Sequence, residues 1–108
     1  MNWEPLISSS LVELERGHLL KFRAKHPFED EVVMMVCEEA NSAGKGRSLM
    51  TISGYKAGIN CYVTFPRELM TKGLTREWLI ENWSNWVVPG GDIESVRVRT
   101  NLSSKELP

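Results

Sequence analysis

Three of the four tryptophans of this chain lie in one stretch, Leu74-Thr-Arg-Glu-Trp-Leu-Ile-Glu-Asn-Trp-Ser-Asn-Trp-Val-Val-Pro-Gly-Gly91. Thr75 is a favourable N-cap, and Glu77 suits the positive end of the helix dipole. Pro89 and the two glycines after it stop a helix, so the segment predicts one that runs from Thr75 to about Val88. At about 100° per residue, the helix has one apolar stripe, which contains Leu79, Ile80, Trp83, Trp86 and Val87. We expect this stripe, above all Trp83 and Trp86, to anchor the helix on the core.

Trp78 falls beside the stripe, nearer to the polar face that carries Glu77 and Glu81. Two interpretations are open for this residue. It makes a second packing contact with the core, or it is an exposed aromatic residue of a binding surface.

The rest of the chain predicts a sheet. Strand patterns cover 11–14, 18–24, 32–37, 49–53, 59–65 and 92–100. Gly17 suits a three-residue hairpin loop between the first two strands. The run 32–37 is apolar at every position, which favours a central strand covered on both faces. We predict an α+β fold, an antiparallel sheet of about five or six strands with one main helix packed on one face.

Size and composition indicate one soluble domain. The chain has 108 residues, of which 25% are charged and 42% hydrophobic, so we expect a single domain over 1–108 with a core from about 10 to 100 and a frayed tail at 101–108. The N-terminus lacks the features of a signal peptide, and no apolar run is long enough to span a bilayer. We expect a cytoplasmic protein with no membrane partner.

Residues with reactive side chains are few and scattered. Cys37 and Cys61 lie in apolar strand segments and are expected to be buried thiols, while His18 and His26 flank one strand without metal-ligand spacing. Gly44–Arg47 does not fit a phosphate-binding loop and is interpreted as a basic hairpin loop. We therefore predict no catalytic residues, no metal and no cofactor, and the protein is not expected to be an enzyme.

Charge is segregated along the chain, although the net charge is only −1. Residues 1–40 hold eight acids and four bases, whereas 41–76 hold six bases and one acid. Such a bipolar surface suits a protein partner better than a phosphate backbone. A nucleic-acid-binding or regulatory module is the alternative, because an outward basic sheet face would form from Lys21, Arg23, Arg97 and Arg99, with Tyr62 nearby.

Three segments resemble a known family when they are taken together and in order. They are Phe22-Arg-Ala-Lys-His-Pro-Phe-Glu-Asp-Glu31, Ser53-Gly-Tyr-Lys-Ala-Gly58 and Glu77-Trp-Leu-Ile-Glu-Asn-Trp-Ser-Asn-Trp-Val-Val-Pro89. The combination resembles immunity protein family 45 of bacterial polymorphic toxin systems, over roughly residues 10 to 99. The resemblance implies a cytoplasmic antidote that binds the toxic C-terminal domain of a cognate effector and blocks it.

Such an antidote needs a large complementary surface and no catalytic group. The candidate partner-binding residues are an acidic turn, a loop and part of the helix: Glu29, Asp30, Glu31, Tyr55, Lys56, Glu77, Trp78 and Glu81. The two acidic groups, at 29–31 and 77–81, suggest phosphate surrogates for the basic cleft of a nuclease toxin. The sequence is also compatible with a homo-oligomer.

Overall fold

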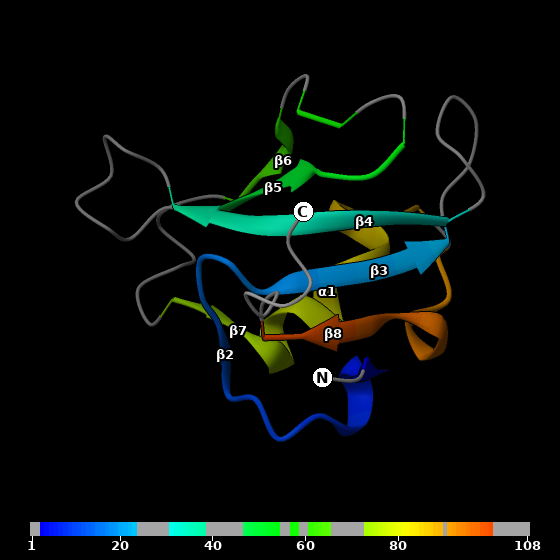
Figure 1. The fold of residues 1–108 in the computed structure, drawn as a ribbon. Helices are drawn as coiled ribbons and strands as arrows, with labels where there is room; N and C mark the ends of the chain where they lie inside the picture. The colour runs from blue at the N-terminus through cyan, green and yellow to red at the C-terminus, as the bar shows by residue number, and fades with distance from the viewer. Residues whose placement is uncertain are drawn as a thin grey trace.

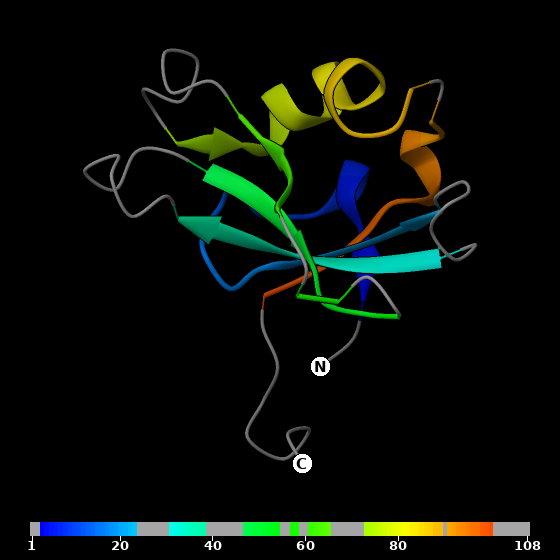
Figure 2. The same cartoon turned by 90° about the horizontal axis from the view of Figure 1, so that it is seen from above.

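A sheet with a helix on one face forms the body of the protein, whose structure is a computed structural model (Figures 1 and 2). The structure describes residues 3–23, 31–38, 47–54, 57–58, 61–65, 73–89 and 91–100. At residues 61 and 62 it describes the backbone but not the side chains. The main sheet has six strands in the order β1-β8-β3-β4-β5-β6, and its neighbours pair antiparallel. The predicted α+β class is confirmed.

Within the described residues, the elements follow one another as short strands, one helix and two single turns of 3-10 helix. They are β1 (Glu4–Pro5), η1 (Leu6–Ser8), β2 (Glu13–Leu14), β3 (Leu19–Arg23), β4 (Glu31–Glu38), β5 (Arg47–Thr51), β6 (Cys61–Thr64), β7 (Leu74–Thr75), α1 (Arg76–Trp86), η3 (Ile93–Ser95) and β8 (Arg97–Arg99). The predictions at Ala24, His26, Ile59 and Asn60, in the loop at 41–46 and in the tail at 101–108 lie outside the described residues.

Helix α1 begins where the sequence predicts. The Thr75 hydroxyl accepts a hydrogen bond from the Trp78 amide at 3.1 Å, as an N-cap does. Trp83 is 2% exposed, and its ring meets that of Phe22 edge-on with 4.9 Å between centroids. Trp83 is therefore an anchor of the core, as predicted, whereas Trp86 is only half-buried. The helix ends at Trp86, two residues before the expected end.

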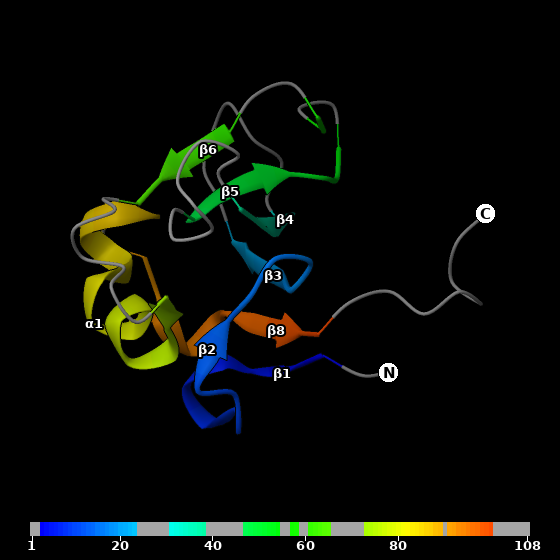
Figure 3. The same ribbon diagram turned by 90° about the vertical axis from the view of Figure 1, so that its left-hand side faces the viewer.

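Strand β4 is central, but it is not covered on both faces, so that expectation is wrong. Its buried residues alternate with half-exposed ones: Val32, Met34 and Val36 are at most 1% exposed, while Val33, Met35 and Cys37 are half-exposed. The reason is that α1 packs against only one face of the sheet (Figure 3). The expectation of a buried thiol is wrong at Cys37 for the same reason. The same expectation for Cys61 concerns a side chain that the structure does not describe.

The predicted hairpin between the first two strand segments is also wrong. Strand β2 pairs with β7 in a separate two-stranded sheet, in which Leu14 lies opposite Leu74. Gly17 does adopt the expected positive φ, at +90°, but its amide donates to the carbonyl of Val36 in β4. The turn thus leads the chain into the main sheet, while Leu14 is fully buried in the core.

The end of the sheet that β8 and β1 form is only partly predicted from the sequence. The segment 92–100 begins with η3, whose first turn is capped by the Asp92 carboxylate, and only Arg97–Arg99 form a strand. Val96 and Val98 point inward, as expected. Strand β1 and η1 had no sequence signal, yet β1 forms the sheet edge beside β8.

The burial of Trp83 yields a stability prediction. Replacing it with alanine removes the contact with Phe22 and leaves a cavity, so Trp83→Ala should lower the free energy of unfolding by about 3–5 kcal/mol. Trp86→Ala is the matched control and should cost clearly less, because that ring is half-buried. Urea unfolding of both variants measures the difference. Equal losses would contradict the assignment of Trp83 as the anchor.

Candidate partner-binding surfaces

The segment between β1 and β2 is clamped to the start of α1 by one side chain. The Arg76 guanidinium donates from Nε to the Leu11 carbonyl at 2.9 Å and from Nη1 to the Ile7 carbonyl at 3.1 Å. Its Nη1 also lies 3.4 Å from the Leu6 carbonyl, and its backbone amide donates to Val12. Hydrogen bonds from a charged donor are stronger than neutral ones, so the clamp fixes this segment.

The clamped segment presents apolar side chains to solvent. Among the described residues, the large hydrophobic side chains that are exposed are those of Val12, at 81%, and Ile7, at 43%. Beside Val12 lies a hollow of about 320 Å³, lined by Ser9–Val12 and by Thr75–Glu77. We call it the clamp hollow. It combines an exposed aliphatic side chain with a carboxylate.

Two of the predicted partner-binding residues belong to this region. Glu77 lines the clamp hollow, and Glu81, one turn further along α1, is exposed as well. Residues four apart lie on the same side of a helix, so the two carboxylates form an acidic ridge that starts at the hollow.

Trp78 packs against the edge of the core. Its ring meets Phe65 edge-on at 5.6 Å between centroids and lies tilted against Trp86 at 6.1 Å. Asn82 donates a hydrogen bond to its carbonyl at 2.9 Å. The side chain is nevertheless only half-buried. The packing interpretation of Trp78 is therefore correct, and its uncovered part still offers aromatic surface next to the acidic ridge.

Of the predicted acidic residues that the structure describes, Glu31 does not lie with Glu77 and Glu81. Glu31, the first residue of β4, is exposed and lies directly across from Arg23. Both residues alternate with the buried Val32 and Phe22, so they face away from α1. Glu31 is therefore on the opposite side of the sheet from Glu77 and Glu81. The remaining predicted site residues, Glu29, Asp30, Tyr55 and Lys56, lie outside the described residues.

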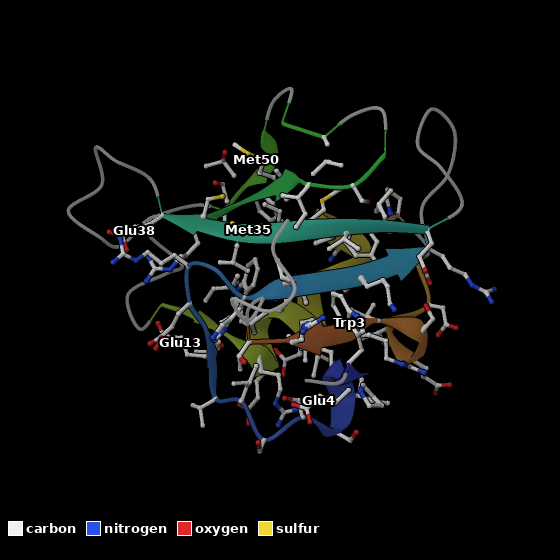
Figure 4. The ribbon with its side chains drawn as sticks, viewed as in Figure 1. Trp3, Glu4, Glu13, Met35, Glu38 and Met50 are labelled. Atoms are coloured by element: carbon white, nitrogen blue, oxygen red, sulfur yellow. The ribbon has the colours of Figure 1, made fainter. Side chains whose placement is uncertain are left out.

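The face of the sheet away from α1 is a second surface, and it faces the viewer in Figure 4. We call it the open sheet face. Its described members outside the buried positions include Trp3, Lys21, Arg23, Glu31, Val33, Met35, Met50, Arg97 and Arg99. The outward rows of basic residues were predicted from strand alternation. Trp3 was missed, because a tryptophan next to a two-residue strand carries no local signal.

Trp3 organises the basic residues of this face. The Nζ atom of Lys21 lies 4.6 Å from the centre of its ring, and the Arg99 Cζ atom lies 5.5 Å from it. Both distances are within the range of cation–π attraction. The indole thus gathers two cations that come from different strands.

The described residues contain no recognisable reaction centre. No three histidine, cysteine, aspartate or glutamate side chains in this part of the chain gather as metal ligands would. Nor does the described part include a helix that is long and apolar enough to cross a membrane. The described residues form two surfaces of different composition, which are the clamp hollow with its acidic ridge and the open sheet face.

The fold and these surfaces together define a small α+β protein. A family comparison is more specific. Residues 6–98 match the family model described as Immunity protein 45, which covers most of the 108-residue chain. The chain belongs to the Immunity protein 45 family, as the three sequence segments had indicated. No curated protein and no solved structure matches it.

The Arg76 clamp leads to a prediction about the N-terminal segment. Lysine keeps the charge but cannot donate from two nitrogens in a fixed fork, so Arg76→Lys should cost about 1–3 kcal/mol of stability. Amide hydrogen exchange around Ser9–Val12 should also become faster. Arg16→Lys, at an exposed turn position, is the control and should change neither. Unaltered exchange in Arg76→Lys would show that the clamp does not hold the segment.

Proposed function

We propose that this protein binds the toxic C-terminal domain of a cognate effector in a bacterial polymorphic toxin system and neutralises it by occlusion or by holding it inactive. It acts as a stoichiometric inhibitor in the cytoplasm of the producing cell, and not as an enzyme. Membership of the Immunity protein 45 family supports the immunity role. The described surfaces support binding as its means.

The observation that carries the proposal is the exposure of Val12 beside the clamp hollow. An aliphatic side chain that is 81% exposed gains free energy when a partner covers it. The neighbouring hollow of about 320 Å³ has room for side chains of that partner. Because Arg76 already fixes the segment, association would not have to order it, which lowers the entropic cost of binding.

The acidic ridge gives this surface its electrostatic preference. Glu77 lies on the hollow and Glu81 follows it, so a toxin surface with basic residues would be attracted and steered. The uncovered part of Trp78 adjoins the ridge and supplies an aromatic contact. The further contacts expected at Glu29, Asp30, Glu31, Tyr55 and Lys56 stay predictions.

The test is a co-expression and binding experiment with the C-terminal domain of the effector that is encoded next to this protein. Val12→Ser and Glu77→Lys should each weaken the complex about 5- to 30-fold, because each removes a contact at the centre of the proposed surface. Val12→Ser should leave stability unchanged, since its side chain is exposed, whereas Glu77→Lys should cost about 1 kcal/mol, because Glu77 interacts favourably with the helix dipole. Isothermal titration calorimetry measures the affinities.

Glu94→Lys is the matched charge control, because Glu94 is exposed in η3, outside the clamp hollow. It should bind like the wild type. Rescue of growth by the wild-type protein without a detectable complex would contradict neutralisation by binding. A tight complex that neither Val12→Ser nor Glu77→Lys weakens would show that the toxin binds elsewhere.

A further inference from the structure

The open sheet face differs in charge from the helix side of the molecule. Its described residues include four bases and a single acid: Lys21, Arg23, Arg97 and Arg99 against Glu31. Lys21 and Arg97 are direct cross-strand neighbours, and the Arg97 guanidinium also donates to the carbonyls of Glu94 and Val96. Like charges directly opposite each other destabilise a sheet, and a partner of opposite charge would relieve such repulsion.

The middle of the open sheet face is apolar. Met35 lies directly across from Met50. Val33 is two residues before Met35 in β4 and is therefore on the same face. All three side chains are half-exposed. Methionine is flexible and polarisable, which allows it to fit irregular partner surfaces. The face therefore has an apolar patch over β4 and β5 next to a basic patch over β3 and β8, and protein interfaces combine apolar and polar parts of this kind.

Trp3 lies at the outer end of the basic patch, beside the β1 edge of the sheet. Lys21 Nζ and Arg99 Cζ lie 4.6 and 5.5 Å from its ring centre, so the cations are held beside an aromatic side chain that is itself half-exposed. Tryptophan and arginine are the residues most enriched at the energetic centres of interfaces. The arrangement presents both at one edge of the sheet.

The open sheet face is joined to the clamp hollow around this edge. Trp3 precedes β1, and β1 leads directly into η1 with the exposed Ile7. Ser9, which lines the hollow, donates a hydrogen bond to the Glu4 carboxylate of β1 at 2.9 Å. A partner seated on the hollow would thus need only to extend past the β1 edge to reach Trp3.

We propose that the open sheet face is a second part of the toxin-binding surface and that it takes an acidic region of the same toxin domain. Carboxylates of the toxin pair with Lys21, Arg23 and Arg97, while its apolar side chains cover Met35 and Met50. This inference rests on the proposed function and adds to it the chemistry of the partner. The toxin domain carries both a basic region for the acidic ridge and an acidic region for this face.

A protein fits this face better than a nucleic acid does. A phosphate backbone would gain from the four bases but nothing from the half-exposed Val33, Met35 and Met50. A protein surface gains from both, because apolar burial and charge pairing act together at interfaces. The observations therefore favour an acidic protein surface.

The experiment measures association of the toxin domain with three variants of the full chain. The Lys21→Glu/Arg23→Glu double variant should reduce the association rate at least about tenfold and weaken its dependence on salt. Trp3→Ala should mainly speed dissociation. Arg16→Glu, which reverses an exposed charge in the turn before β3, is the control and should associate like the wild type. Circular dichroism melts confirm that each variant is folded.

Each alternative gives a distinct result. If the double variant and Trp3→Ala bind like the wild type while Glu77→Lys is impaired, this inference is overturned and the proposed function stands. If the wild-type chain itself does not bind the toxin domain, the proposed function fails as well.

Two other results would also overturn the inference. One is retention of the wild type, but not the double variant, on a single-stranded DNA oligonucleotide at physiological salt, with unchanged toxin binding. The other is a wild-type dimer in light scattering that the double variant loses, again with unchanged toxin binding.

Discussion

The edge-on contact between Trp83 and Phe22 is the interaction on which the architecture depends. It fixes the middle of α1 to one face of the main sheet, with 4.9 Å between ring centroids and almost no exposure of the indole. The helix starts directly after β7, so anchoring it also places Thr75 and Arg76. Arg76 can then reach the carbonyls of the N-terminal segment and hold it in place.

The same interaction explains why the opposite face of the sheet stays open. Among the described elements, α1 is the one helix longer than a single turn, and it covers the face that carries Phe22. The outward residues of β3, β4 and β8 keep their basic and apolar side chains partly exposed. Among the described residues, an acidic ridge therefore lies on the helix side and a basic patch on the open sheet face.

Local signals in the sequence were sufficient for the helix and for most of the sheet. The Thr75 cap and the apolar spacing predicted α1, and strand alternation predicted the inward Phe22 and Val98. The failures came from contacts between distant residues. The apolar run 32–37 does not reveal that only one of its faces is covered, and the pairing of Leu14 with Leu74 cannot be deduced from a turn signal at Gly17.

The candidate surfaces were harder to predict than the fold for the same reason. Glu77 and Trp78 were found because they lie on a recognisable helix. Val12 and Trp3 were missed, since their importance depends on the Arg76 clamp and on the pairing of β1 with β8. Both arise from contacts between segments more than sixty residues apart, which no local pattern records.

The four tryptophans offer the most direct test of the central claim that the toxin domain binds around the β1 edge while the helix anchor stays buried. Indole N–H signals in a ¹⁵N-resolved spectrum, each assigned by substitution, report on each ring separately. Upon saturation with the toxin domain, the signals of Trp3 and Trp78 should shift while that of Trp83 stays in place. A saturated complex in which Trp3 and Trp78 are unchanged, or in which Trp83 shifts most, would contradict the account.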